Sequence, residues 1–305
     1  MNRTAHPHTM FVLLDGQSVP YPPAVLTGHL RMCGLTLRQQ TEVMEAVAQR
    51  LTRGSTPLEL SALNRFLEDE LSALGEAVVR RWTMLAEFER RRRETGGPSP
   101  IVVALEGASA TGKSMLALEV AADLSATRVI GTDSLRQVLR TIHSEDEHPE
   151  LFCHTYEAHR YKQTGPSTLS PSVRGYLAQC DMIVPHLRNA VERILSEGLE
   201  CVIDGVHVIP GSIQDAGASV IELVINPSEA IHRSMFMSKS GAGGLRTVTH
   251  SPEERALHFE RAREIQDYLV HLAESAGVKA VSFKDYEQAL REIRSAILTR
   301  IRELL

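Results

Sequence analysis

Short apolar runs alternate with longer amphipathic stretches along the second two thirds of the chain. The short runs contain β-branched residues and have the length of buried strands, at 101–105, 128–131, 200–204, 219–225 and 278–282. The longer stretches favour helices, at 115–124, 134–142, 176–197, 252–276 and 284–305. Strands separated by helices predict an α/β fold with a parallel sheet flanked by helices. Ligands bind such sheets at the carboxyl ends of the strands.

The first third of the chain follows a different pattern. Two short runs, at 10–14 and 18–21, flank the turn dipeptide Asp15-Gly16 and predict a β-hairpin. Four helical stretches follow, at 23–33, 36–53, 56–74 and 75–93. The Gly- and Pro-rich segment 95–100 predicts a linker. We therefore expect a small, mainly helical domain at 1–94 and an α/β domain at 101–305.

The strongest chemical signal lies directly after the first strand of the α/β domain. Gly107 to Ser114 read GASATGKS, which matches the phosphate-binding loop pattern G-x-x-x-x-G-K-[ST]. In this pattern backbone N–H groups surround phosphate oxygens, the lysine reaches the outer phosphates and the final hydroxyl holds Mg²⁺. A strand before the loop and a helix after it place a helix N-terminus against the phosphates. The competing interpretation is a glycine-rich turn with an incidental lysine.

The loop therefore predicts a nucleotide site that takes ATP and Mg²⁺. The residues expected to bind the nucleotide are Gly107, Ser109, Ala110, Thr111, Gly112, Lys113 and Ser114.

Amino-acid composition indicates a globular protein and argues against some functional classes. The 305 residues are 43% hydrophobic and 23% charged, values typical of a soluble globular protein. The net charge of −5 argues against a dedicated nucleic-acid binder, because such proteins need basic surface. Four scattered cysteines without a C-x-x-C pair favour reduced thiols and a cytoplasmic location. We expect neither a signal peptide nor a membrane-spanning segment.

Two acidic residues follow apolar strands and are candidates for roles in phosphoryl transfer. Asp204 ends the run Cys201-Val202-Ile203, the form expected of a carboxylate that holds Mg²⁺ directly or through water. The alternative is an ordinary strand-to-turn junction, which has the same sequence pattern of an apolar run followed by Asp-Gly. Asp133 follows the strand at 128–131 and could orient an acceptor hydroxyl or accept its proton. Its alternative role is a helix cap.

Basic residues near these acids suggest an anionic substrate. Arg136 and Arg140 share a helix flank close to Asp133, although a solvated face is the commoner fate of such pairs. The glycine-rich segment 240–244 is flanked by cations and could form a lid that closes over the phosphates. Its candidate residues are Arg233, Lys239 and Arg246. A surface loop with incidental basic residues is the alternative.

The polar insert at 143–175 contains several histidines whose spacing fits no zinc pattern. We interpret His154, Tyr156 and His159 instead as walls of a substrate pocket.

Motifs of the α/β domain resemble those of 2-phosphoglycerate kinase, a P-loop kinase known from methanogenic archaea. The matching segments are the phosphate loop, VIGTDSLRQVLR at 129–140, IDGVHVIPG at 203–211 and, more weakly, EIQDYL at 264–269. The resemblance implies ATP-dependent phosphorylation of the hydroxyl of a small phosphorylated acid. It places Lys113 and the loop amides at ATP, and Asp133 and Arg136 at the acceptor. It also places Asp204-Gly205-Val206-His207 in the lining of the site.

The N-terminal domain resembles an ATP-cone, a small hairpin-plus-helices module that binds ATP or dATP as a regulator. The matching segments are VLLDG at 12–16, VPY at 19–21 and GLT at 34–36. Leu13 and Leu14 stand where cone modules usually carry basic residues. A module without nucleotide binding would be structural or would support a homo-oligomer.

Further departures leave several functions open. The family usually has Glu where this chain has Asp204, and its arginine-rich lid is reduced around 233–240. The principal hypothesis is a kinase for a small phosphorylated acid such as 2-phosphoglycerate. A kinase for another metabolite such as phosphomevalonate, a nucleotide sensor without catalysis, and an NTPase that uses water as the acceptor are the alternatives.

Overall fold

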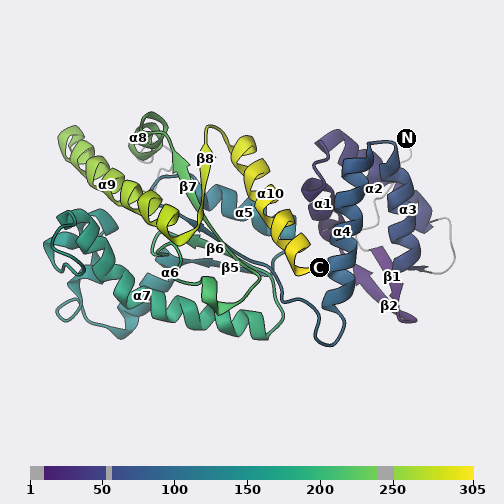
Figure 1. Ribbon diagram of the computed structural model, residues 1–305, viewed down its shortest axis with the longest axis horizontal. Helices are drawn as coiled ribbons and strands as arrows, with labels where there is room; N and C mark the ends of the chain where they lie inside the picture. Colours follow the sequence, from purple (N-terminus) through teal and green to yellow (C-terminus); the bar gives the residue numbers. More distant parts are fainter. Residues whose placement is uncertain (1–9, 53–56, 239–250) are drawn as a thin grey trace, which may run out of the picture. The chain divides into compact units, whose positions relative to one another are not determined.

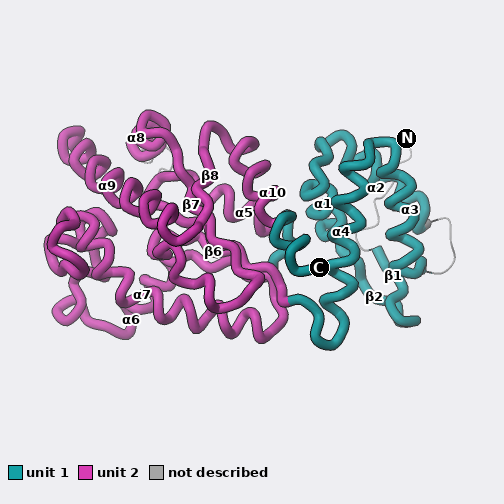
Figure 2. Tube along the Cα trace, viewed as in Figure 1, with its two compact units in different colours: residues 1–98, 122–126, 298–305 teal, residues 99–121, 127–297 magenta. Residues whose placement is uncertain are grey.

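The structure is a computed structural model that describes residues 10–52, 57–238 and 251–305. It divides into two compact units (Figure 2). Unit 1 comprises residues 1–98 together with 122–126 and 298–305, and unit 2 comprises 99–121 and 127–297.

Unit 1 contains a small sheet and four helices. Strand β1 (Met10–Leu14) pairs antiparallel with β2 (Gln17–Tyr21) and parallel with the short strand β3 (Leu58–Glu59). Asp15 and Gly16 have positive φ angles of 52° and 76° at the tip of the hairpin, as a two-residue hairpin turn requires. The helices are α1 (Pro23–Met32), α2 (Leu37–Thr52), α3 (Leu60–Ser72) and α4 (Glu76–Arg92).

The core of unit 1 is built from apolar residues at helical spacing. Leu63, Leu67 and Leu71 recur every four residues along α3 and are fully buried. Leu26 and Leu30 of α1 are equally buried, and Trp82 of α4 is 1% exposed. This spacing places one face of each helix in the core, which is why the pattern predicted helices.

Unit 2 is built on a sheet of five parallel strands in the order β5-β6-β4-β7-β8 (Figure 1). Its strands are β4 (Val102–Glu106), β5 (Arg128–Gly131), β6 (Cys201–Gly205), β7 (Val220–Pro227) and β8 (Lys279–Phe283). The helices that connect and flank them are α5 (Lys113–Leu124), α6 (Thr132–Ile142), α7 (Pro171–Ser196), α8 (Glu229–Ser238), α9 (Pro252–Ala276) and α10 (Tyr286–Leu304). Short 3₁₀ turns lie at Pro149–Phe152, Thr155–Arg160 and Gln214–Ala216.

Both faces of the central strand are covered. Val102 and Ala104 of β4 pack with Leu187 and Val191 of α7, and the alternate residues Val103 and Leu105 are just as fully buried. A strand buried on both faces reads as a continuous apolar run, which explains the sequence pattern of β4.

The strand register brings three loops together at one edge of the sheet. Glu106 of β4 is aligned with Gly205 of β6, and Asp204 of β6 is aligned with Gly131 of β5. The segments that follow β4 and β5 therefore start beside the end of β6. This edge carries the phosphate loop, Asp133 and Asp204.

The fold predicted from the sequence is confirmed: a parallel sheet with helices, and a smaller, mainly helical part with a hairpin. Three elements differ from the prediction. The predicted helix 56–74 begins only at Leu60, after the short strand β3. Residues 229–238, which include the predicted lid cation Arg233, form helix α8, and α7 begins at Pro171, inside the predicted irregular insert. The assignment of an ATP-cone stays a prediction. In the described part of the chain, no helix has the length and apolar character needed to cross a membrane.

Candidate active site

The phosphate loop bends between β4 and α5 with backbone angles that ordinary residues avoid. Gly107 and Gly112 have φ angles of 142° and 91°, and Ala110 has a φ angle of 69°. A Cβ atom on Gly112 would lie 2.9 Å from the ring of Phe283. Both the backbone angle and the close approach therefore favour glycine at position 112.

The loop is held in place by side chains from two helices. Gln266 of α9 accepts a hydrogen bond from the backbone N–H of Ala108 at 2.8 Å. His232 of α8 lies 2.9 Å from the carbonyl oxygen of Ser109, so its Nε2 must donate. Gln266 belongs to the segment 264–269 that resembles the kinase family. Its hydrogen bond to the phosphate loop gives this part of the matching segment a structural role.

Lys113 begins α5 and is 5% exposed. Its Nζ donates to the carbonyl oxygen of Ala108 at 2.7 Å and to Oγ1 of Thr111 at 3.3 Å. The ammonium group thus lies within the curve of the loop, where a phosphate-binding loop places its ligand.

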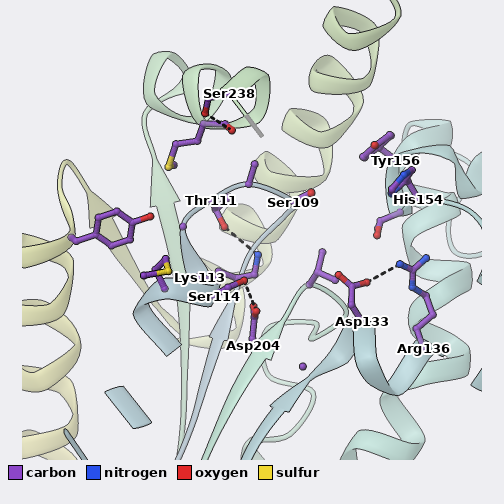
Figure 3. A pocket seen from close by; sticks show the side chains of 18 residues that line it. Ser109, Thr111, Lys113, Ser114, Asp133, Arg136, His154, Tyr156, Asp204 and Ser238 are labelled. Carbon is purple, nitrogen blue, oxygen red and sulfur yellow. Dashed lines mark hydrogen bonds and ion pairs between the residues drawn. The ribbon is translucent and has the colours of Figure 1, made fainter. Parts of the chain in front are cut away.

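Ser114 and Asp204 face each other across the end of the sheet. The Ser114 hydroxyl donates to the Asp204 carboxylate at 2.5 Å (Figure 3). Both groups offer hard oxygen atoms, which suit Mg²⁺. Among the described residues there is no cluster of three or more metal-ligating side chains. A hydroxyl and one carboxylate still fit Mg²⁺, because this ion commonly takes one or two carboxylates and completes its shell with water and phosphate.

Asp133 and Arg136 form an ion pair on the first turns of α6. The Arg136 guanidinium donates to the Asp133 carboxylate at 2.8 Å, and it is only 12% exposed, while Asp133 is 67% exposed (Figure 3). Burial by itself would raise the pKa of Asp133, but the field of its neighbours, Arg136 and Lys113 among them, lowers it. Asp133 is therefore ionised at neutral pH and can accept a hydrogen bond.

One cavity of about 430 Å³ contains both halves of this arrangement. The phosphate loop from Ser109 onward lines one part, together with Asp204. Asp133 and Arg136 line another part, opposite the rings of His154 and Tyr156, which stack with centroids 5.1 Å apart (Figure 3). The structure thus brings together the loop, both acids and two of the three predicted pocket walls, whereas His159 does not line this cavity.

Other predicted residues lie outside the lining of this cavity. Arg140 donates to the Leu151 carbonyl oxygen at 2.7 Å, and its guanidinium lies 5.4 Å from the ring centroid of Phe152. Arg233 on α8 donates to Glu260 at 2.5 Å and lies 4.3 Å from the ring centroid of Phe259. His207 is completely buried among protein groups. Lys239 and Arg246 lie outside the described residues.

Several lining residues were not predicted from the sequence. They come from elements far apart along the chain: Met115, Thr155, Ser238 and Tyr286. Val206, which the family resemblance placed at the site, also lines the cavity. Tyr286 begins α10 and is 42% exposed, an unusual position for an aromatic ring. No local motif surrounds it, so only the folded arrangement reveals its place at the cavity.

Comparison with known proteins extends the similarity beyond the motifs. No protein-family model matches the chain. The chain resembles 2-phosphoglycerate kinases over nearly its whole length. It is 27% identical to the protein of Methanopyrus kandleri, covering 93% of this chain and 85% of that one. It is 25% identical to the protein of Pyrococcus horikoshii, covering 95% and 94% respectively. These relatives confirm the resemblance predicted from the motifs and the prediction of a P-loop phosphotransferase.

Solved structures with some likeness to this chain include two kinases. A sugar kinase from Janibacter sp. HTCC2649 has 13% identity and a TM-score of 0.38, covering 65% of this chain and 94% of that one. A gluconokinase from Sinorhizobium meliloti 1021 has 14% identity and a TM-score of 0.38, covering 68% and 94%.

Burial of His207 gives a testable pH dependence of stability. Burial lowers the pKa of His207 to about 3, opposed by Asp133 and assisted by Arg136 and Lys113. The unfolded chain binds a proton at this histidine below its ordinary pKa of about 6.5, whereas the folded chain stays neutral. The folded state therefore loses stability as the pH falls below 6.5. We expect His207 alone to lower the free energy of unfolding by about 2 kcal/mol between pH 6.5 and 4.5.

Urea denaturation of the wild type and of a His207→Gln variant at both pH values measures this effect. The variant should lose about 2 kcal/mol less than the wild type over this interval. Equal losses in the two proteins would contradict the assignment of a neutral, buried His207.

Proposed function

We propose that this protein is an ATP-dependent kinase that phosphorylates the hydroxyl of a small phosphorylated acid, with 2-phosphoglycerate as the favoured acceptor. The observation that carries the proposal is the single cavity. It joins a phosphate loop to an ionised carboxylate, Asp133, and to a buried cation, Arg136. The similarity to named 2-phosphoglycerate kinases over most of the chain supports the same acceptor.

On this proposal the triphosphate of ATP lies in the loop. The backbone N–H groups of residues 109–114 and the N-terminus of α5 stabilise its negative charge. Lys113 moves from the Ala108 carbonyl oxygen to the outer phosphates. Ser114 and Asp204 would hold Mg²⁺, which neutralises charge on the transferring phosphoryl group when it is bound.

The acceptor lies between α6 and the stacked rings. Asp133 accepts a hydrogen bond from its hydroxyl and aligns that oxygen with the γ-phosphorus. The bond from γ-phosphorus to the acceptor oxygen forms as the bond to the leaving oxygen of ADP breaks, and the hydroxyl proton leaves toward Asp133. Arg136 offers positive charge to the anionic acceptor. With 2-phosphoglycerate the product is 2,3-bisphosphoglycerate.

Release of ADP across a panel of acceptors tests this function. The panel contains 2-phosphoglycerate, 3-phosphoglycerate, unphosphorylated glycerate, phosphomevalonate and a reaction without acceptor. We expect ADP release to depend on the acceptor and to be fastest with 2-phosphoglycerate. Equal release without any acceptor would indicate an NTPase that uses water, and ATP binding without release would indicate a nucleotide sensor.

A further inference from the structure

A buried hydrogen-bond network lies beneath the acceptor side of the cavity. It joins Thr132 of α6, His207 after β6 and Gln179 of α7, all of which are 0% exposed. The Thr132 Oγ1 lies 3.2 Å from Nδ1 of His207, and Nε2 of His207 lies 3.0 Å from Oε1 of Gln179. Thr132 directly precedes Asp133, so the network begins at the residue beside the proposed catalytic carboxylate.

The hydrogen-bond partners of Gln179 determine which ring nitrogen of His207 carries the proton. The Gln179 amide nitrogen faces the carbonyl oxygens of Glu150 and Cys153, which can only accept hydrogen bonds. Its Oε1 is therefore the acceptor that faces His207, and Nε2 of His207 must carry the proton. Nδ1 is then an acceptor for the hydroxyl of Thr132 at 3.2 Å, and the carbonyl oxygen of Asp204 is a second acceptor for the same hydroxyl at 3.4 Å. The Thr132 oxygen in turn accepts the backbone N–H groups of Val206 and His207 at 3.0 and 3.2 Å.

The same network reaches the wall of the acceptor pocket. The carbonyl oxygen of Cys153 accepts hydrogen bonds from both Gln179 and Arg136. The next three residues along the chain, His154, Thr155 and Tyr156, line the cavity. One set of buried groups thus connects the backbone next to Asp133 with the backbone next to the stacked rings.

The phosphate loop is held by different partners. Gln266 binds the N–H of Ala108, and His232 binds the carbonyl oxygen of Ser109. The hydrogen-bond partners of the Gln179 side chain are Glu150, Cys153 and His207, which lie outside residues 107–114. A disturbance at Gln179 should therefore alter the acceptor half of the cavity and spare the nucleotide half.

We propose that Gln179 and His207 are positioning residues that set the distance between Asp133 and the His154–Tyr156 wall, and thereby the binding of the acceptor. This inference rests on the proposed kinase function. Neither residue lines the cavity, so both act through the groups that they hold.

A Gln179→Met variant tests the inference, because methionine has a similar length but cannot form the hydrogen bonds to His207, Glu150 and Cys153. We expect the KM for the acceptor to rise about 10-fold or more, as misplacement of a reacting group allows, while the KM for ATP changes less than about 2-fold. Hydrogen exchange should accelerate at residues 149–156 and stay unchanged at 107–114.

Tyr176→Phe is the matched control on the same helix. It removes the buried hydroxyl that donates to the Val208 carbonyl oxygen at 3.1 Å, and it keeps the ring, which belongs to the apolar cluster against which Tyr156 packs. It should lower stability and leave both KM values and the exchange of 149–156 as in the wild type.

A second pair of variants covers the case in which Gln179→Met does not fold. Thr132→Val removes only the hydroxyl and should show the same rise in acceptor KM, and Thr132→Ser should restore the wild-type value. Parallel rises in both KM values, or no change in either, would overturn the inference.

A wild type that shows no acceptor-dependent ADP release would defeat the proposed function rather than this inference. Hydrogen exchange would then be the measurement that tests the positioning role. Faster exchange at 149–156 in the folded variant supports the positioning role, and unchanged exchange overturns it.

Discussion

Replacement of Lys113 by alanine is expected to lower kcat by about 10³-fold, the scale on which preorganised charge acts in phosphoryl transfer. The Lys113 ammonium lies inside the curve of the loop and is 5% exposed. On the proposed mechanism its charge reaches the transferring group with a short movement from the Ala108 carbonyl oxygen, and a low-dielectric surrounding strengthens that interaction. Release of ADP with saturating ATP and acceptor measures the change.

Two controls separate chemistry from folding in this experiment. Lys284→Ala removes an exposed lysine that does not line the cavity and should leave kcat unchanged. Thermal denaturation of Lys113→Ala should show a folded protein, although the loop loses the bonds from Nζ to Ala108 and Thr111. Wild-type turnover in Lys113→Ala would exclude the loop as the site of phosphoryl transfer.

The sequence contained enough information to predict the sheet and the loop. Continuous apolar runs mark the buried strands β4 and β6, and β4, β5 and β6 all lie within a residue or two of the predicted runs. The position of Asp133 and Asp204 at strand ends followed from the same reasoning, because parallel strands end at one edge. The register of β4, β5 and β6 then places both acids beside the loop.

Contacts across strands could not be predicted in this way. Glu106 directly precedes the phosphate loop and is completely buried, and burial and the neighbouring Glu222 raise its pKa well above its usual range. This pair exists because β4 and β7 are neighbours, with Ala104 aligned with Glu222. The sequence places the two acids 116 positions apart and gives no strand order.

The contacts of Arg233 also could not be predicted from the sequence. Its spacing to a glycine-rich segment suggested a lid cation, but its partners are Glu260, which lies 27 positions further along the chain, and the ring of Phe259. Arg233 instead lies on helix α8, which spans Glu229–Ser238. Ion pairing over such separations becomes visible only when α8 and α9 are placed side by side.

Replacement of Asp133 by asparagine distinguishes a kinase from a nucleotide sensor. Asparagine keeps the size of the side chain but removes the negative charge, so the acceptor hydroxyl loses its strongest hydrogen-bond acceptor. We expect kcat to fall by about 10²- to 10³-fold, within the range for loss of a general base. ATP affinity should stay within about 2-fold of the wild type, because the loop keeps its own partners, Gln266 and His232. Acceptor-dependent ADP release and calorimetric titration with ATP measure the two quantities.

Asp146→Asn is the matched control, since it makes the same change of charge at an exposed acid in the insert, away from the cavity. It should keep wild-type turnover. A kinase requires Asp133 because the ionised carboxylate can take the hydroxyl proton and an amide cannot, whereas a sensor that merely binds ATP has no acceptor to deprotonate. Equal turnover of the Asp133→Asn and Asp146→Asn variants would therefore remove Asp133 from the reaction, even if both proteins bind ATP as the wild type does.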